Sequence, residues 1–552
     1  MDNPRSGSVH SEGRMSPPRP INEPVLDYAS GSTEREELEE ALSIMSSRQI
    51  EIPLIIGGEE VHTDDVKDVV MPHDHQHVLA RFHRAGREEA LAAIEAAREA
   101  WQEWANWPWQ DRVAVLLRAA ELLAGPWRAR MNAATMLGQS KTIHQAEIDA
   151  ACEIVDFWRF NSHNAAILYE EQPDSSPGVW NRMDHRPLEG FVLAITPFNF
   201  TSIGANLPTA PAVMGCTTIW KPATTGVFGA YYTYRLLEAA GLPPGVISFL
   251  PGRSAEISET LIGSPELAGI HFTGSTGVFQ QLWKQVADNL ENYRTYPRIV
   301  GETGGKDFIV AHASADMDAL ATGIIRGAFE YQGQKCSAAS RVYIPDTMWA
   351  KMKDRLLSEV ESIQMGDVTN FRNFMGAVID EKAFKKITSY IEDARSSSDA
   401  EVLVGGESDG SEGYFIRPTI LQAKRPDYVT MCEEIFGPVV TIYVYPENQW
   451  AETLELVDNT SPYALTGAVF ATDRKAITEA HAALRHAAGN FYVNDKPTGA
   501  VVGQQPFGGS RASGTNDKAG SGLNLVRWVS ARTVKELFVP PTDYRHPYMG
   551  AE

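Results

Sequence analysis

The chain has 552 residues, of which 43% are hydrophobic and 22% are charged, so wholesale disorder and collagen-like or coiled-coil architectures are excluded. Acidic residues outnumber basic ones by 71 to 49, and the net charge of −22 repels phosphate backbones and anionic lipid. We therefore expect a soluble folded protein that binds no nucleic acid and inserts into no membrane.

The N-terminal region combines a polar arm with predicted helices. Residues 1–32 are rich in Pro, Ser and Gly and have no hydrophobic periodicity, so we expect a mobile arm. Acidic residues among the first twenty are atypical of a transit peptide and leave targeting open. Thr33 and Glu36 match a capping box at the start of a helix, and apolar spacing predicts further helices over residues 88–104 and 111–123.

Short apolar runs then alternate with helical patterns. Strands are predicted over residues 191–195, 217–220, 246–250 and 269–272. Strands separated by helices pair in parallel, and such sheets bind ligands beyond the carboxyl ends of their strands. Neither G-x-G-x-x-G nor G-x-x-x-x-G-K-[ST] occurs, so both common phosphate cradles are absent in their usual form.

The second half of the chain predicts another α/β unit, which extends from residue 298 to about residue 522. Residues 169–190 and 523–537 carry β-branched and aromatic side chains outside this pattern, so we expect them to form an added sheet edge. The four cysteines are too far apart for a disulfide framework or paired metal ligands, which indicates a reducing compartment.

Three polar side chains could carry chemistry. Cys336 lies among glycine and polar residues, which suits an accessible nucleophilic thiol, although a lone cysteine is more often inert packing. Glu302 precedes a glycine-rich segment and is a candidate general base. Asn199 follows the predicted strand 191–195 and offers an amide donor for an oxyanion. Together they fit the formation and hydrolysis of an acyl-enzyme.

These positions belong to a series of motifs that resembles the aldehyde dehydrogenase superfamily over roughly residues 50–540. The others, in chain order, are Trp220–Ala223, Phe272–Ser275, Glu433–Pro438 and Pro506–Gly509. Longer stretches narrow the resemblance to the eukaryotic type of the 1-pyrroline-5-carboxylate dehydrogenase family. They are Gln145–Ala150, Phe329–Cys336, and the run from Gly489–Lys496 through Gly514–Asp517.

The resemblance implies an α/β fold of the aldehyde dehydrogenase type. A Rossmann-type NAD-binding domain would comprise residues 33–173 and 191–300, and an α/β catalytic domain residues 301–524. Residues 174–190 and 525–552 would form a small β oligomerisation flap and tail. The family further implies a homodimer and the mitochondrial matrix, with the cytoplasm as the alternative.

The implied reaction is NAD-dependent oxidation of L-glutamate γ-semialdehyde to L-glutamate, the second step of proline degradation. Cys336 would attack the aldehyde, Asn199 would hold the oxyanion with the backbone N–H of Cys336, and Glu302 would activate water to hydrolyse the thioester. Two alternatives remain, namely a semialdehyde dehydrogenase of broader specificity and a non-catalytic binding protein on the same fold.

The resemblance also implies binding residues. Those for NAD are Ile195, Thr196, Lys221, Gly274, Ser275, Glu434 and Phe436. Two positions depart from the superfamily pattern: Thr224 replaces a glutamate that binds the ribose, and Phe279 replaces a glycine near the pyrophosphate. For the substrate, Glu153 would bind the ammonium, while the carboxylate and aliphatic stem would contact Ser337, Gly499, Ala500, Phe200 and Phe507.

No metal site is predicted. His73, His75 and His77 alternate and would share one face of a strand, as ligands do. Because no cysteine or further histidine cluster is near them in sequence, we expect a solvated surface strand instead.

Overall fold

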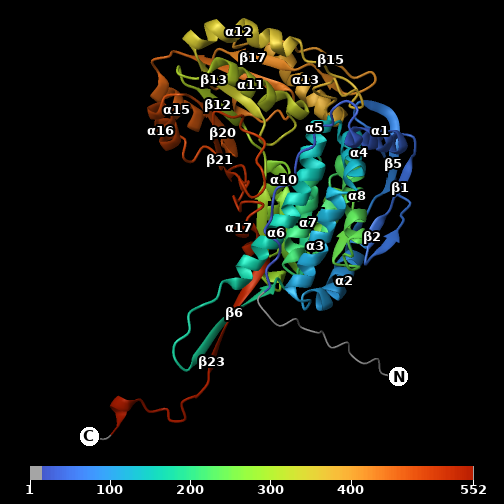
Figure 1. Cartoon of the computed structure of the whole chain (residues 1–552), viewed down its shortest axis with the longest axis vertical. Coiled ribbons are helices and arrows are strands. Elements are labelled where there is room, and N and C mark those ends of the chain that lie inside the picture. Colours follow the sequence, from blue (N-terminus) through green and yellow to red (C-terminus); the bar gives the residue numbers. More distant parts are fainter. Residues whose placement is uncertain (1–14, 551–552) are drawn as a thin grey trace.

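The computed structural model describes residues 15–550, which form two large sheets covered by helices (Figure 1). The first sheet has the strand order β11-β10-β7-β8-β9-β2-β3, and strands β7 to β11 run parallel. Its strands are β2 (Leu54–Ile56), β3 (Glu59–Val61), β7 (Phe191–Thr196), β8 (Thr217–Pro222), β9 (Ile247–Phe249), β10 (Leu267–Thr273) and β11 (Arg298–Glu302). All four strands predicted between residues 190 and 276 are confirmed.

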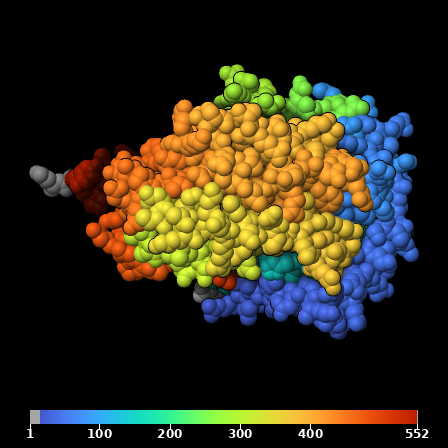
Figure 2. Space-filling view, turned by 90° about the horizontal axis from the view of Figure 1, so that it is seen from above, coloured from blue at the N-terminus to red at the C-terminus, as the bar shows by residue number. Residues whose placement is uncertain are grey.

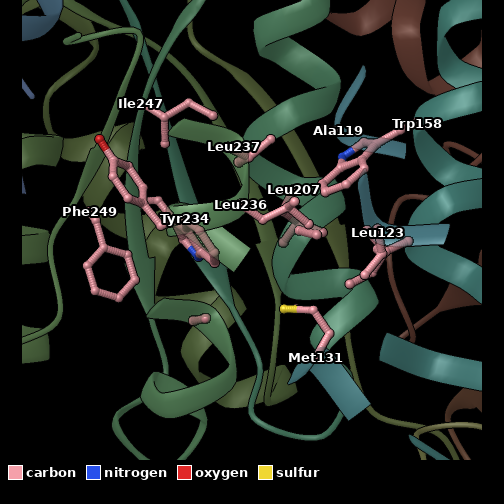
Figure 3. Close-up of a cluster of buried hydrophobic side chains, with 14 of the residues drawn as sticks. Ala119, Leu123, Met131, Trp158, Leu207, Tyr234, Leu236, Leu237, Ile247 and Phe249 are labelled. Carbon is pink, nitrogen blue, oxygen red and sulfur yellow. The ribbon is translucent and has the colours of Figure 1, made fainter. Parts of the chain in front are cut away.

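The helices around the first sheet bury alanine-rich and aromatic faces. α2 buries Ala90, Ala93 and Ala97 on one side, as the spacing predicts. Figure 3 shows the largest apolar cluster, where α3, α6, α7 and α8 pack beside β9 through side chains such as Trp158 and Phe249. The helices of this part are α1 (Thr33–Ser46), α2 (Arg87–Trp104), α3 (Trp109–Ala124), α4 (Arg128–Gln139), α5 (Ile143–Ala146), α6 (Ile154–Glu170), α7 (Thr201–Val213), α8 (Val227–Ala239), α9 (Ser254–Ile262) and α10 (Thr276–Asp288).

The second sheet has the order β14-β17-β18-β13-β12-β20-β21, parallel except for the β14–β17 pair. Its strands are β12 (Asp307–Ala311), β13 (Ala339–Pro345), β14 (Ala400–Val404), β17 (Thr419–Ala423), β18 (Val439–Tyr445), β20 (Thr466–Phe470) and β21 (Asn490–Val493). Figure 2 shows this C-terminal part, in yellow and orange, over most of one face of the molecule. Its helices are α11 (Met317–Phe329), α12 (Asp346–Glu361), α13 (Glu381–Ser396), α14 (Val429–Cys432), α15 (Trp450–Asn459), α16 (Arg474–Ala483) and α17 (Gly522–Leu525).

Three smaller sheets lie outside this pattern, and a two-stranded arm projects from the body (Figure 1). In the arm, β6 (Val179–Pro187) pairs antiparallel with β23 (Val529–Leu537) over nine residues, so the two predicted β segments do pair with each other. The smaller sheets are β1 (Ile50–Ile52) with β5 (Asp74–His83) and β4 (Val66–Met71), β15 (Ser408–Asp409) with β16 (Phe415–Ile416), and β19 (Tyr463–Ala464) with β22 (Ser510–Arg511). Among residues 15–550, no helix has the length and apolar character needed to cross a membrane.

The start of the chain differs from its prediction. Residues 1–14 of the expected arm lie outside the described part, and residues 15–32 form no helix or strand. Residues 22–28 are nonetheless bound to the rest of the protein by hydrogen bonds to Asp156 and Glu147. The composition of the segment does not indicate these contacts, because the partners lie more than 100 residues away in the sequence. α1 begins at Thr33, but its N-cap is Ser32, which makes no side-chain cap bond, so the capping box is wrong.

Candidate active site

Two cavities meet at the thiol of Cys336. One opens at the carboxyl ends of β7, β8 and β10, where a doubly wound sheet is expected to bind its ligand. The other lies between α6, α7 and the loop of residues 496–507. They share Phe272, Thr273 and Cys336 as lining residues. A molecule in either cavity can therefore reach the same sulfur atom.

The first cavity contains buried charged groups. Lys221 at the end of β8 is only 4% exposed and makes no ion pair with a described residue, and burial lowers its pKa to about 8. The Glu434 carboxylate accepts a hydrogen bond from Gly305 N at 3.0 Å, and burial raises its pKa. All seven residues predicted to bind NAD line this cavity: Ile195, Thr196, Lys221, Gly274, Ser275, Glu434 and Phe436. The hydroxyl groups of a dinucleotide could hydrogen-bond to the Lys221 ammonium and to the remaining acceptor sites of the Glu434 carboxylate.

Both departures from the superfamily pattern have a structural account. Thr224 lines the first cavity, so no carboxylate repels a ribose phosphate at that position. Phe279 is buried and stacks on Phe272, with ring centroids 5.3 Å apart. A Cβ atom at Gly301 would come within 2.2 Å of the Phe279 ring, so the larger side chain fits because residue 301 is glycine.

The second cavity has a carboxyl group in its wall. The Ser202 hydroxyl donates to Glu153 Oε2 at 2.8 Å, and burial raises the pKa of Glu153 to about 8. Ser337, beside the cysteine, lies 2.7 Å from Thr498 between hydroxyl oxygens. All six residues predicted to bind the substrate line this cavity: Glu153, Phe200, Ser337, Gly499, Ala500 and Phe507.

A left-handed turn presents Cys336. Tyr331, Gln332 and Gly333 have φ of +52°, +54° and +65°, a conformation that side-chain-bearing residues rarely adopt. The Gln332 amide stabilises this turn by donating hydrogen bonds to the backbone oxygens of Ser140 and Ala377 at 2.9 and 2.8 Å. A side chain at residue 333 would lie 2.2 Å from Gly437 O.

The three candidate catalytic groups surround the junction. Asn199 is buried and its amide donates to Gln334 O at 3.0 Å, two residues before the thiol. Glu302 ends β11, and its carboxylate accepts from Gly509 N at 2.8 Å. Burial raises the pKa of both Glu302 and Cys336, and nearby carboxylates raise that of the thiol further. The sulfur is therefore protonated until a base or a positive charge acts on it.

Sequence patterns do not reveal a buried ion pair beside the site. Lys141 and Asp149 are each 1% exposed and 2.6 Å apart. Asp149 also accepts from Thr201 N and Ser202 N, so it holds the start of α7 directly after Asn199. Asp149 lies in a π-helical turn of residues 147–153, an irregularity that often marks functional positions and has no sequence signal of its own.

The three alternating histidines differ in their surroundings. Each contacts a different partner, and His73 precedes the strand and is buried, so the prediction of a solvated strand is wrong for it. The partners of His73, His75 and His77 are Ser140 Oγ, Gly410 O and Ser46 O. Elsewhere in the described chain, Glu51, His62 and His83 approach one another, and an ion pair of 2.6 Å joins His83 to Glu51.

Known proteins resemble this chain over nearly its whole length. A relative from Dictyostelium discoideum, named delta-1-pyrroline-5-carboxylate dehydrogenase, mitochondrial, is 54% identical over 539 residues, 97% of each chain. The human protein of the same name is 50% identical over 529 residues, 96% of this chain and 94% of the relative.

Solved structures agree with the fold. The delta-pyrroline-5-carboxylate dehydrogenase from Mycobacterium tuberculosis, bound with NAD, has a TM-score of 0.95 and 54% identity, and covers 98% of this chain and 100% of its own. A 1-pyrroline-5-carboxylate dehydrogenase from Thermus with bound NAD has a TM-score of 0.88 at 33% identity, over 94% and 99%. The sequence pattern of the aldehyde dehydrogenase family matches residues 60–534. The chain thus belongs to the aldehyde dehydrogenase family.

Proposed function

We propose that the protein oxidises L-glutamate γ-semialdehyde, formed from 1-pyrroline-5-carboxylate, to L-glutamate with NAD as the oxidant, in the second step of proline degradation. The observation that carries this proposal is the position of Cys336, which forms a common wall of two cavities of different character. One holds a lysine ammonium that makes no ion pair within residues 15–550, and the other holds a half-buried carboxyl and a serine hydroxyl. The names and bound NAD of the relatives support the same reaction.

The chemistry needs one nucleophile, one oxyanion donor and one base. The Cys336 thiol gives its proton to solvent water, its Sγ attacks the aldehyde carbon, and the Asn199 amide turns from Gln334 O to the oxyanion that forms. NAD, when bound, accepts the hydride that leaves this carbon. Glu302 then removes a proton from water, which attacks the thioester and releases the carboxylic acid and the thiol.

Specificity comes from pairing both charges of an amino acid. Glu153 binds the ammonium, and Ser337 with the backbone N–H groups of Gly499 and Ala500 binds the α-carboxylate. The rings of Phe200 and Phe507 flank the aliphatic stem. A simple aldehyde leaves these buried polar groups unpaired, which disfavours its binding. A semialdehyde dehydrogenase of broad specificity has no need of a buried Glu153.

The test follows NADH absorbance with 1-pyrroline-5-carboxylate, propanal and succinate semialdehyde, each repeated with NADP. We expect kcat/KM to be at least roughly 100-fold higher for 1-pyrroline-5-carboxylate than for propanal, since two charged contacts are at stake. Comparable values for all three aldehydes would contradict the substrate assignment. Cys336→Ser is the control, and it should abolish NADH formation while NAD binding persists. A silent binding protein would be indifferent to that change.

We also propose the larger organisation. The first large sheet belongs to an NAD-binding domain of residues 33–173 and 191–300. The second belongs to a catalytic domain of residues 301–524. The arm of residues 174–190 and 525–552 joins two copies in a homodimer, because it exposes apolar side chains such as Trp180 and Phe538. The names of several relatives support a mitochondrial location.

A further inference from the structure

A segment near the N-terminus makes hydrogen bonds to two elements that flank the second cavity, the π-helical turn with α6 and the loop of residues 499–505. We call residues 21–28 the strap. It has no regular structure, yet Leu26 N and the Tyr28 hydroxyl donate to Glu147 at 2.9 and 2.8 Å, and Glu23 N donates to Asp156 Oδ1 at 2.7 Å. Glu147 opens the π-helical turn that ends at Glu153, so the strap is fixed to the wall that carries this carboxyl.

Asn22 connects that wall to the opposite one. Its amide nitrogen donates to Asp156 Oδ2 and to Val502 O, both at 2.8 Å, and its amide oxygen accepts from Gln504 at 3.0 Å. Asp156 lies on α6 next to Phe157, which lines the cavity. Val502 lies in the loop of residues 499–505, and it too lines the cavity.

The loop has no other hydrogen-bonded attachment within residues 15–550. Gly499, Ala500 and Gly503 make no hydrogen bond there, and Val501 bonds only within the loop, to Gln504 and Gln505. Both bonds that leave residues 499–505 end on Asn22. Within residues 15–550, Asn22 therefore supplies every hydrogen bond that joins the loop to the rest of the protein. Buried Val502 and the close approach of Gly503 to the Phe160 ring add packing contacts.

We propose that Asn22 is a positioning residue that holds the loop of residues 499–505 at the distance from Glu153 that an amino-acid substrate requires. The inference rests on the proposed function, in which Gly499 and Ala500 bind the carboxylate and Glu153 binds the ammonium. Asn22 touches neither group. It fixes the spacing between them, and so selects for an aldehyde that bears both charges.

The first test compares Asn22→Ala with wild type in the full chain. We expect KM for 1-pyrroline-5-carboxylate to rise about tenfold, because two hydrogen bonds of the loop are lost. The KM for propanal and kcat should stay within about twofold, since propanal has no carboxylate for the loop to bind. An equal rise in KM for both aldehydes, or no rise for either, would overturn the proposal.

The matched control is Tyr28→Phe, which removes one of the two hydrogen bonds that the strap donates to Glu147 and leaves the Asn22 contacts in place. It should lower the melting temperature and leave both KM values unchanged. Hydrogen exchange gives a readout that does not depend on the substrate. Amides of residues 499–505 should exchange faster in Asn22→Ala than in wild type or Tyr28→Phe, and equal rates in all three proteins would refute the tether. If wild type fails to oxidise 1-pyrroline-5-carboxylate, the proposed function fails, and the exchange rates still decide the role of Asn22.

A charge variant adds a pH signature. Asn22→Asp sets a second carboxylate within hydrogen-bond reach of Asp156, so the two groups repel each other unless they share a proton. We expect the ratio of KM in this variant to KM in wild type to fall as the pH drops from 8 to 6. A constant ratio would mean that the contact with Asp156 does not position the loop. Taking the ratio cancels the pH dependence of 1-pyrroline-5-carboxylate itself.

Discussion

At the scale of single residues, the proposed role of Glu153 makes substrate binding depend on the protonation of its carboxyl. Burial raises the pKa of its carboxyl to about 8, so the free enzyme holds it neutral below that pH, whereas an ammonium group needs the carboxylate. We expect KM for 1-pyrroline-5-carboxylate to decrease as the pH rises from 6.5 to 8.5. Steady-state NADH assays across this range measure the effect.

Glu153→Gln supplies the control because it keeps the shape and removes the titration. Its KM should be at least about tenfold higher at pH 8.5, and the ratio to wild type should fall towards one at low pH. Parallel pH profiles for the two proteins would show that Glu153 does not bind a cation. The KM for propanal should not depend on this residue.

In the proposed reaction Glu302 acts after hydride transfer, so its loss should separate the two halves of the reaction. In Glu302→Gln the thioester forms and then hydrolyses slowly, with kcat reduced by roughly 10²- to 10⁴-fold. Stopped-flow absorbance should show a burst of about one NADH per active site, followed by a slow phase. A slow, linear trace without a burst would place Glu302 in the first half of the reaction.

At the scale of elements, the turn before Cys336 is a constrained part of the structure. Gly333→Ala adds a Cβ atom 2.2 Å from Gly437 O at a φ of +65°, so the turn must shift. We expect a loss of about 2–4 kcal/mol of unfolding free energy and a changed rate of thiol alkylation. Chemical denaturation and iodoacetamide labelling measure these two effects.

Gly522→Ala is the matched control, since nothing lies within 4 Å of its Cβ position and its φ is not positive. It should leave stability within about 0.5 kcal/mol of wild type. If both variants behave alike, the turn is more tolerant than its geometry indicates.

An element can be predicted from the sequence when neighbouring residues determine its conformation, and not when contacts between distant segments determine it. The strands of the first sheet are continuous apolar runs bounded by polar residues, because a parallel sheet is buried on both faces, and the sequence alone locates them. The turn at residues 331–333 has no such signal. Tyr331 and Gln332 disfavour positive φ, and the hydrogen-bond partners of the Gln332 side chain lie far away along the chain.

The same reasoning explains which parts of the site the sequence reveals. Cys336, Glu302 and Asn199 stand beside glycines or at strand ends, and they are found from their surroundings together with the family motifs. The partnerships of Lys141 with Asp149 and of Asn22 with Val502 arise only when distant segments pack. No local pattern in the sequence encodes them.

At the scale of the whole molecule, the projecting arm predicts assembly. Phe538 lies just beyond β23 and is 61% exposed, so its side chain contributes little to the stability of a monomer. Phe538→Asp should therefore leave the melting of the monomer unchanged and weaken the dimer by about tenfold or more. Light scattering would then report a mass nearer 60.7 kDa than twice that value at low concentration.

Tyr296→Asp is the control, because Tyr296 is also an exposed aromatic residue, at 82%, and lies outside the two strands of the arm, just before β11. It should leave the mass unchanged. A monomeric wild type, or a Phe538→Asp variant that stays dimeric, would contradict assembly through the arm.

In the proposed reaction, the nucleophile and the general base come from different sheets. Glu302 ends β11 in the first sheet, Cys336 precedes β13 in the second, and residues 303–306 are all that separate β11 from β12 along the chain. A small slip between the sheets would therefore change the separation of base and thiol while both sheets stay folded. The turnover rate therefore reports on the relative position of the two large sheets. In rising denaturant, turnover should vanish before circular dichroism records any loss of helix.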